Sequence, residues 1–254
     1  SKISKSMSKS GYGSNQVVTS LNSPFLKRVI SFIYPPMPTL NTIPHKKKEI
    51  IKENIFNGKI VLNIGSGADS GSGKWLWKDK VLTANKTINL DITLNENISF
   101  IADAHDLPVK DESIDSVVMQ ALIEHIVDPV RVIKEAHRVL KPGGFIYLEV
   151  PFLQGFHADP YDYQRYTLPG LRNLTSDFED ISSGVSVGPF CSLVWLIRDG
   201  FSSCFKNKFL FNLSRFLLAW ILSPLRYLDY FSRHTNASKR LANEFFLLGR
   251  KADS

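Results

Sequence analysis

The sequence predicts a doubly wound α/β fold, with a mostly parallel sheet and a C-terminal helical insertion. Strand-like and helix-like segments alternate between residues 59 and 150, which is typical of parallel strands joined by crossover helices. The strands are apolar along their whole length, as expected for a sheet that is covered on both faces. A glycine-rich turn follows the first of these strands, as in folds that bind nucleotide-like ligands.

Each element has its own local signal. The pattern predicts one helix over 128–140, where Asp128 can cap, Pro129 suits the first turn, and Val130 and Ile133 begin an apolar stripe. Lys141–Gly144 should end it. A shorter helix is predicted over 46–56, with Ile50, Ile51 and Ile55 on one side. Strands are predicted at 59–64, 87–92, 98–102, 114–119, 145–150, 181–187 and 244–249.

Composition excludes several classes of protein. The 254 residues are 43% hydrophobic and 22% charged, which is ordinary for a globular protein and rules out a disordered chain or a coiled coil. Two cysteines are too few for a disulfide framework or a cysteine-rich zinc module. No signal peptide opens the sequence, and no apolar run reaches the roughly 18 residues of a spanning helix. We therefore expect a cytoplasmic protein.

Charge divides the chain into an acidic centre and two basic flanks. The net charge is +7 over residues 1–58, −6 over 59–188 and +6 over 189–254. Such flanks suit either nucleic acid or an anionic membrane surface. Four units are predicted along the chain. They are a flexible basic tail and lead-in (1–43), the α/β domain (44–188), a basic apolar helical insertion (189–241), and the last strand with the C-terminus (242–254).

Three strand ends carry candidate ligand-binding residues. Asn63, Gly65, Ser66 and Gly67 form the turn after the first strand, where glycine lets the backbone approach a ligand closely. Asp91 ends the second strand and can accept hydrogen bonds from ribose hydroxyls. Asp103 follows the third strand. Because open α/β sheets bind ligands at the carboxyl ends of their strands, these residues point to one site.

These motifs resemble the class I S-adenosylmethionine-dependent methyltransferases, and specifically the methyltransferase type 11 group. The matching stretches, in the family's order, are VLNIGSG (61–67), NLDI (89–92), ADAHDLP (102–108), IDSVVMQALIEHIVDP (114–129) and EAHRVLKPGGFIYLEVP (135–151).

The resemblance implies a Rossmann-like sheet with an antiparallel last strand, and S-adenosyl-L-methionine as cofactor. Gly65 and Gly67 would hold its methionine part. Asp91 and Ile92 would bind the ribose side, and Asp103 with Ala104 the adenine. Gln120 and Ala121 would line the sulfonium pocket. The chain departs from the family at Asn63, where an acidic residue is usual, and at Asp69, which replaces a glycine.

The predicted reaction is methyl transfer to an oxygen of a small molecule, sugar or lipid-linked glycan. Two alternatives remain: a cofactor-binding scaffold without catalysis, and an NAD-dependent oxidoreductase. The oxidoreductase lacks support, because the third glycine of GxGxxG and a Tyr-x-x-x-Lys pair are both missing. Nucleic acid is disfavoured as a substrate, because no Asn/Asp-Pro-Pro-Tyr motif or cysteine nucleophile follows the fourth strand.

The segment after the fifth strand supplies the candidate catalytic residues. His157 is a candidate general base, which Asp159 or Asp162 would orient, and Arg165 would bind an acidic group of the acceptor. The alternative is that Asp162 and Arg165 form a structural ion pair. His125, after the fourth strand, would contact the acceptor or cap a turn. No HxxxH pair or similar spacing is present, so no metal site is predicted.

The apolar segment 189–241 allows several interpretations. Phe209–Leu222 is its most hydrophobic stretch, and Lys and Arg residues surround it. Such a helix suits an anionic membrane interface, which would fit a lipid-linked acceptor. It would equally suit a subdomain that covers the sheet, or a dimer interface. The sequence leaves the oligomeric state undetermined.

Overall fold

The computed structural model describes residues 35–36, 38–66, 74–77, 84–94, 98–157, 161–233 and 235–253. Seven strands form one sheet in the order β3-β2-β1-β4-β5-β7-β6, and β7 runs antiparallel to both of its neighbours while the other pairs are parallel. The strands are β1 (Ile60–Ile64), β2 (Lys86–Asp91), β3 (Phe100–Ile101), β4 (Ile114–Gln120), β5 (Leu140–Pro151), β6 (Phe178–Val187) and β7 (Glu244–Lys251). The predicted sheet and its antiparallel last strand are confirmed.

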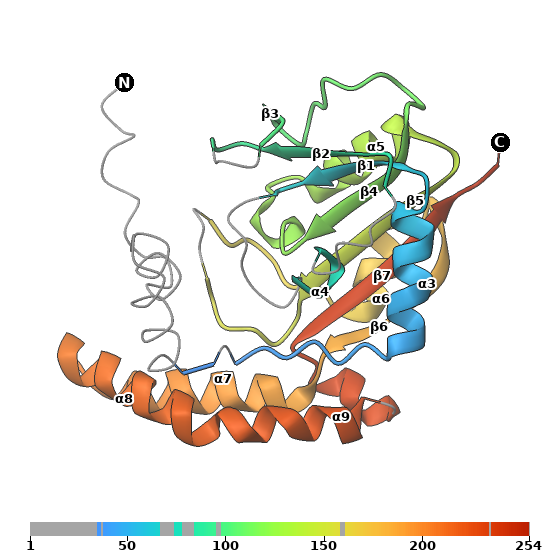
Figure 1. The fold of residues 1–254 in the computed structure, drawn as a ribbon. Coiled ribbons are helices and arrows are strands. Elements are labelled where there is room, and N and C mark those ends of the chain that lie inside the picture. Colours follow the sequence, from blue (N-terminus) through green and yellow to red (C-terminus); the bar gives the residue numbers. More distant parts are fainter. Residues whose placement is uncertain are drawn as a thin grey trace, which may run out of the picture.

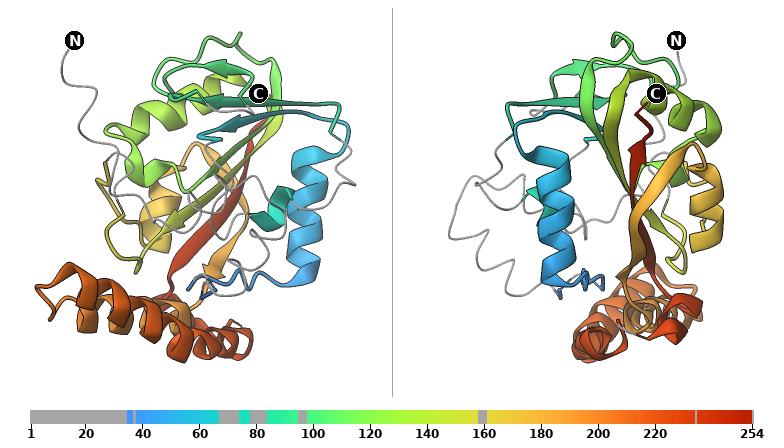
Figure 2. Two further views of the ribbon diagram at one scale, coloured as in Figure 1. Left: turned by 60° about the vertical axis from the view of Figure 1, so that its left-hand side comes forward. Right: turned by 90° about the vertical axis from the view of Figure 1, so that its right-hand side faces the viewer.

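Helices cover both faces of the sheet (Figures 1 and 2). On one face lie α3 (His45–Phe56) and the short α4 (Lys74–Trp77), and on the other lie α5 (Pro129–Val139) and α6 (Leu168–Leu174). A 3-10 turn, η1 (Ile123–His125), joins β4 to α5.

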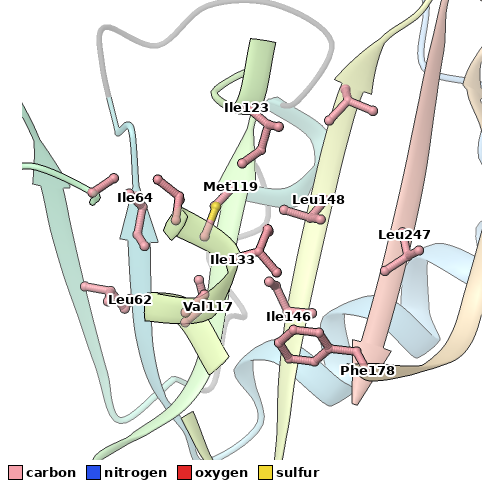
Figure 3. Close-up of a cluster of buried hydrophobic side chains, with 14 of the residues drawn as sticks. Leu62, Ile64, Val117, Met119, Ile123, Ile133, Ile146, Leu148, Phe178 and Leu247 are labelled. Atoms are coloured by element: carbon pink, nitrogen blue, oxygen red, sulfur yellow. The ribbon is translucent and has the colours of Figure 1, made fainter. Parts of the chain in front are cut away.

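Apolar side chains fill the space between the sheet and each helix layer. On the α5 side, Ile133 packs over Val117, Met119, Ile146 and Leu148 (Figure 3). Two predicted stripe positions are wrong. Val130 is 51% exposed and Ile50 is 47% exposed, and the buried positions are Val132 and Phe56 instead. The other predicted positions, Ile133 in α5 and Ile51 and Ile55 in α3, are buried as expected.

The strand after α5 begins earlier than predicted. Lys141–Gly144 follows the end of the helix as expected, but Leu140 already pairs with Ile114 of β4, so β5 spans Leu140–Pro151. The register then shifts between Ile114 and Ser116, which places the KPGG segment in a bulge. Gly143 has a φ of 70°, a backbone conformation that glycine adopts without strain.

A helical layer is inserted between β6 and β7, and we call it the end layer. It consists of α7 (Pro189–Ser202), α8 (Lys208–Leu222), η2 (Ser223–Leu228), α9 (Asp229–Ser232) and η3 (Asn236–Arg240). It lies across one end of the sheet rather than on a face (Figures 1 and 2), so of the three alternatives the structure does not favour a subdomain that covers a face of the sheet. None of the helices in the described ranges is long and apolar enough to span a bilayer.

Candidate active site

The carboxyl ends of four strands meet at one edge of the sheet. Ile64 of β1 pairs with Leu90 of β2 and with Met119 of β4, and Asp91 pairs with Ile101 of β3. The residues that directly follow these strands are therefore neighbours, as predicted. This edge carries the turn after β1, the two aspartates and η1.

Gly65 turns the chain away from β1 at this edge. Its φ is 73°, and its N–H donates to the carbonyl of Leu90 at 2.8 Å. A Cβ at this position would lie 2.8 Å from Leu122 Cδ1, so both the backbone conformation and the space require glycine. Ser66 N–H donates to the same carbonyl at 3.1 Å. Gly67 and Asp69 lie outside the described residues.

Asp91 and Asp103 each use one carboxylate oxygen to order their own loop. Oδ1 of Asp91 accepts from the N–H and hydroxyl of Thr93, at 2.9 and 3.0 Å. Oδ1 of Asp103 accepts from the N–H and ring of His105, at 2.9 and 2.6 Å. These bonds from His105 lower the pKa of Asp103. In the described part of the chain no donor occupies Oδ2 of either residue, so each can still accept from a ligand hydroxyl or amine.

The remaining predicted cofactor residues differ in how their side chains lie. Ile92 is 68% exposed beside Asp91, whereas the methyl group of Ala104 is buried in the core. Asn63 donates to Asn89 Oδ1 at 3.1 Å. The Gln120 amide lies between Trp77 Nε1 at 2.7 Å and Glu149 Oε2 at 2.8 Å, so it points toward α4.

The set as a whole fits S-adenosylmethionine. A turn that only glycine can occupy admits the backbone close to a ligand, and two ordered carboxylates offer free oxygens for ribose and adenine. Ala121, which follows β4, has a φ of 49°. A non-glycine residue in this region is strained, and such strain is common where a loop lines a ligand site.

The loop that follows β5 is anchored on η1. Tyr163 N–H donates to the Glu124 carbonyl at 2.8 Å, and the Gln164 amide donates to the carbonyls of Ile123 and Ile126 at 3.1 and 2.9 Å. Nδ1 of His125 hydrogen-bonds the Tyr161 carbonyl. The loop therefore lies over the end of β4, next to the predicted sulfonium pocket.

Three titratable side chains meet where this loop crosses η1. Nε2 of His157 lies 3.7 Å from Glu124 Oε1, and Nε2 of His125 lies 3.9 Å from the same oxygen. The Glu124 carboxylate is fully buried, and neither of its oxygens has a hydrogen-bond partner among the described residues. We call Glu124, His125 and His157 the Glu-His cluster.

The sequence analysis identified His125 and His157 as candidate catalytic residues but assigned no role to Glu124. Glu124 comes directly before His125, so its place after the fourth strand was visible, but its burial was not. A carboxylate that is buried without a direct partner is costly unless a positive charge or a donor lies beside it. Both histidines supply this when they carry a second proton.

Asp162 and Arg165 hold His157 in place. The two side chains form a bidentate ion pair, and Arg165 also donates to the carbonyls of Gln154 and Gly155, each at 3.2 Å. Burial opposes the charge on Asp162, but the bonds from Arg165 and from His157 N–H outweigh it and lower its pKa to about 2. This is the ion pair that the sequence left open. Asp159 lies outside the described residues.

His157 is arranged as a proton acceptor. Nδ1 lies 3.0 Å from the Gly155 carbonyl, and in the tautomer that donates to this carbonyl the Nε2 lone pair faces Glu124. Burial disfavours the imidazolium, but Glu124, the Gly155 carbonyl and Asp162 together raise the pKa of His157 above its ordinary value. At 3.7 Å, Glu124 is too far for a direct hydrogen bond, so Nε2 can accept one from a ligand.

The same donor atoms also suit a cation. One atom each from Glu124, His125 and His157 lie within 4.8 Å of one another, and two imidazoles with a carboxylate are a common ligand set for divalent metals. The sequence predicted no metal site, because it contains no HxxxH pair. That rule does not cover this cluster, because His157 comes from a loop that is distant in the sequence from Glu124 and His125.

Comparison with known proteins agrees with this architecture. Residues 77–148 match a family model described as a methyltransferase domain. The chain is 31% identical over 134 residues to the ubiquinone/menaquinone biosynthesis C-methyltransferase UbiE of Rickettsia prowazekii, covering 50% of this chain and 54% of that protein. It is 41% identical over 78 residues to UbiE of Acidiphilium cryptum, covering 30% and 31%. Over this part of the chain, the comparisons agree with the resemblance to S-adenosylmethionine-dependent methyltransferases.

Solved structures share the fold of this chain. The methyltransferase in complex with the Haloferax volcanii Trm112 activator has a TM-score of 0.50 at 16% identity, covering 82% of this chain and 89% of that one. The [4+2]-cyclase SpnF also has a TM-score of 0.50, at 15% identity, covering 82% and 81%. The chain spans about half the length of the curated relatives it matches. The family match ends before the loop that carries His157.

Proposed function

We propose that the protein transfers a methyl group from S-adenosylmethionine to a hydroxyl oxygen of a small molecule or sugar, free or lipid-linked, and that His157 is the general base. The observation that carries the proposal is the buried Glu124 carboxylate beside Nε2 of His157, at the strand edge that bears Asp91 and Asp103. A carboxylate at this distance stabilises the imidazolium that forms when a proton is accepted.

The cofactor supplies a methyl group on a sulfonium, which is already activated toward attack. The acceptor oxygen forms the new bond to the methyl carbon as the carbon–sulfur bond breaks, and S-adenosylhomocysteine leaves with that electron pair. The hydroxyl proton passes to Nε2 of His157. Asp162 and Arg165 act as positioning residues, because they contact the backbone and flank of His157 rather than its Nε2.

A second candidate acceptor is a ring carbon. It is favoured by the likeness to proteins named C-methyltransferases of ubiquinone/menaquinone biosynthesis. In a hydroxylated ring, removal of the hydroxyl proton also makes the neighbouring carbon nucleophilic, so the same base would serve. We favour oxygen, because the match to the named C-methyltransferases covers only about half of this chain.

A scaffold without catalysis is the rival from another class. The cyclase among the structural neighbours illustrates that this fold alone does not determine the reaction. The proposal is supported instead by the Glu-His cluster. Binding of the cofactor alone does not require a buried carboxylate beside two imidazoles.

The test uses methyl-tritiated S-adenosylmethionine and an extract of the producing cells as the source of acceptors. The wild type should transfer label to an extracted small molecule, and His157→Ala should lower the rate about 10²-fold or more. The matched control His45→Ala removes an exposed histidine and should leave the rate unchanged.

Two further measurements separate a base role of His157 from a role in binding the cofactor or a metal. Affinity for S-adenosylhomocysteine should be the same in the wild type and in His157→Ala, and transfer should persist after treatment with a chelator. Equal transfer by wild type and His157→Ala would contradict the role of His157. Loss of transfer on chelation would assign the Glu-His cluster to a metal instead.

A further inference from the structure

The end layer exposes far more apolar surface than its position requires. In α8 only Ala219 is buried, although the helix has the sequence KFLFNLSRFLLAWIL. Neither hydrophobic cluster of the core includes a residue of α7, α8, η2 or α9. The helix packs against α7 along one side and leaves its other side uncovered by the described chain (Figure 2).

The exposed apolar side chains follow the helical repeat. In α7 they include Leu196 and Phe201, and in α8 they recur as Phe209, Leu217 and Ile221. Phe209 is 70% exposed, Ile221 is 69% exposed, and Phe231 of α9 is 80% exposed. Contiguous apolar surface of this kind marks an interaction site on a folded protein.

The charge of the end layer is strongly positive. Residues 189–241 contain eight Lys or Arg and two Asp, a net charge of +6. Both aspartates act within the layer. Asp199 pairs with Arg198 and Arg215, and the buried Asp229 accepts from Phe190 N–H and Cys191 N–H at the start of α7, each at 2.9 Å. Lys206 and Lys208 lie exposed at the loop that leads into α8.

We propose that the end layer docks the protein on an anionic lipid membrane, with the α7–α8 apolar side chains in the interface and the flanking cations on the headgroups. The positive charge of the end layer favours an anionic membrane over a second copy of the chain. A symmetric contact between the end layers of two copies would bring two surfaces of +6 together, whereas anionic headgroups complement both the cations and the apolar side chains. The proposal does not depend on methyl transfer.

Docking would also bring the loop that follows β5 and carries His157, which we call the acceptor loop, close to the membrane. A Cβ at Gly155 would lie 3.3 Å from Trp195 Cε3 of α7, so the loop that carries His157 rests on the end layer. The Asn243 amide after η3 donates to the Leu153 carbonyl of the same loop at 3.1 Å. The end layer and the acceptor loop are therefore one packed unit.

The first experiment compares sedimentation with two vesicle types, phosphatidylcholine alone and an equimolar mixture of phosphatidylcholine and phosphatidylglycerol. The wild type should bind the mixed vesicles at low salt and only weakly the neutral ones. The triple variant Phe209→Ser/Ile221→Ser/Phe231→Ser should bind more weakly, by about tenfold or more. Each substitution removes apolar area that the wild type would bury in the lipid. The control Ile50→Ser/Val130→Ser, also exposed on helices, should bind like the wild type.

The second experiment tests the charges. Lys206→Glu/Lys208→Glu should weaken binding to the mixed vesicles at least about tenfold and should reduce its dependence on salt. The control Lys110→Glu/Lys134→Glu makes the same change of charge on the α5 side and should have a smaller effect. Equal losses in the two pairs would show a general charge effect and would overturn the proposal.

A measurement on the wild type keeps the proposal falsifiable if the substituted proteins do not fold. Brominated lipid in the mixed vesicles should quench the tryptophan fluorescence of the wild type, because Trp220 is 41% exposed on α8. Absence of binding by the wild type would overturn the proposal. So would a concentration-dependent dimer that ignores vesicles and that the three apolar substitutions dissociate.

Discussion

In the proposed reaction, Glu124 is the residue that would stabilise the protonated form of His157. It is fully buried at the end of β4, and the groups that face it are His125, His157 and the Tyr166 ring, whose pKa burial and Glu124 raise to about 12. Asp162 and Arg165 flank His157 from the other side. Glu124 Oε1 lies 3.7 Å from Nε2 of His157, so its charge should raise the basicity of that nitrogen.

We expect the rate of methyl transfer to fall as the pH drops through the pKa of His157, because only the neutral imidazole accepts a proton. That pKa lies above its ordinary value, so the decline should begin at a higher pH than for an unperturbed histidine. Glu124→Gln removes the negative charge, lowers the pKa of His157 and should move the acid limb of kcat/KM to lower pH. An acid limb that stays at the same pH in Glu124→Gln would exclude Glu124 as its cause.

At the scale of the element, α5 positions η1 and thereby the Glu-His cluster. Its N-cap Asp128 accepts from Arg131 N–H at 3.1 Å, and Pro129 occupies the first turn, as the sequence predicted. The Asp128 N–H approaches His105 Nε2 at 3.4 Å, and the ring of His105 also contacts Asp103. One helix start thus connects the loop that carries Asp103 to the turn that carries Glu124.

Asp128→Ala should cost about 1 kcal/mol of unfolding free energy, because one N-terminal N–H of α5 loses its acceptor. Urea denaturation of the two proteins measures this difference. Asp128→Asn keeps a capping oxygen and should lose much less. Equal losses for Ala and Asn would show that the carboxylate charge, rather than the cap, stabilises the helix.

The elements that carry local signals were predictable, and those that depend on distant contacts were not. The strands and α5 follow from period, caps and breakers, so their bounds agree to within a few residues. The exposure of Val130 depends on how the helix is rotated against the sheet, which propensity does not determine. The approach of Glu124 to His157 joins two segments that are distant in the sequence, and no local pattern encodes it.

At the scale of the whole molecule, opposite charges are placed on different parts of the structure. The segment with the cofactor edge carries a net charge of −6, and the end layer carries +6. The sequence showed this division but not its geometry, since the same apolar helices could have covered the sheet. The structure places them across its end (Figure 1), where their outer surface is exposed and their inner surface supports the acceptor loop.

Calorimetric titration with S-adenosylhomocysteine tests the central claim most directly. The wild type should bind, and Asp91→Ala should weaken binding by about 1–3 kcal/mol, because the charged acceptor for the ribose hydroxyls is lost. Glu179→Ala removes an exposed carboxylate on β6, away from the strand edge, and should bind like the wild type. Absence of binding by the wild type, or equal affinity in Asp91→Ala, would contradict the assignment of the β1–β2 edge as the cofactor site.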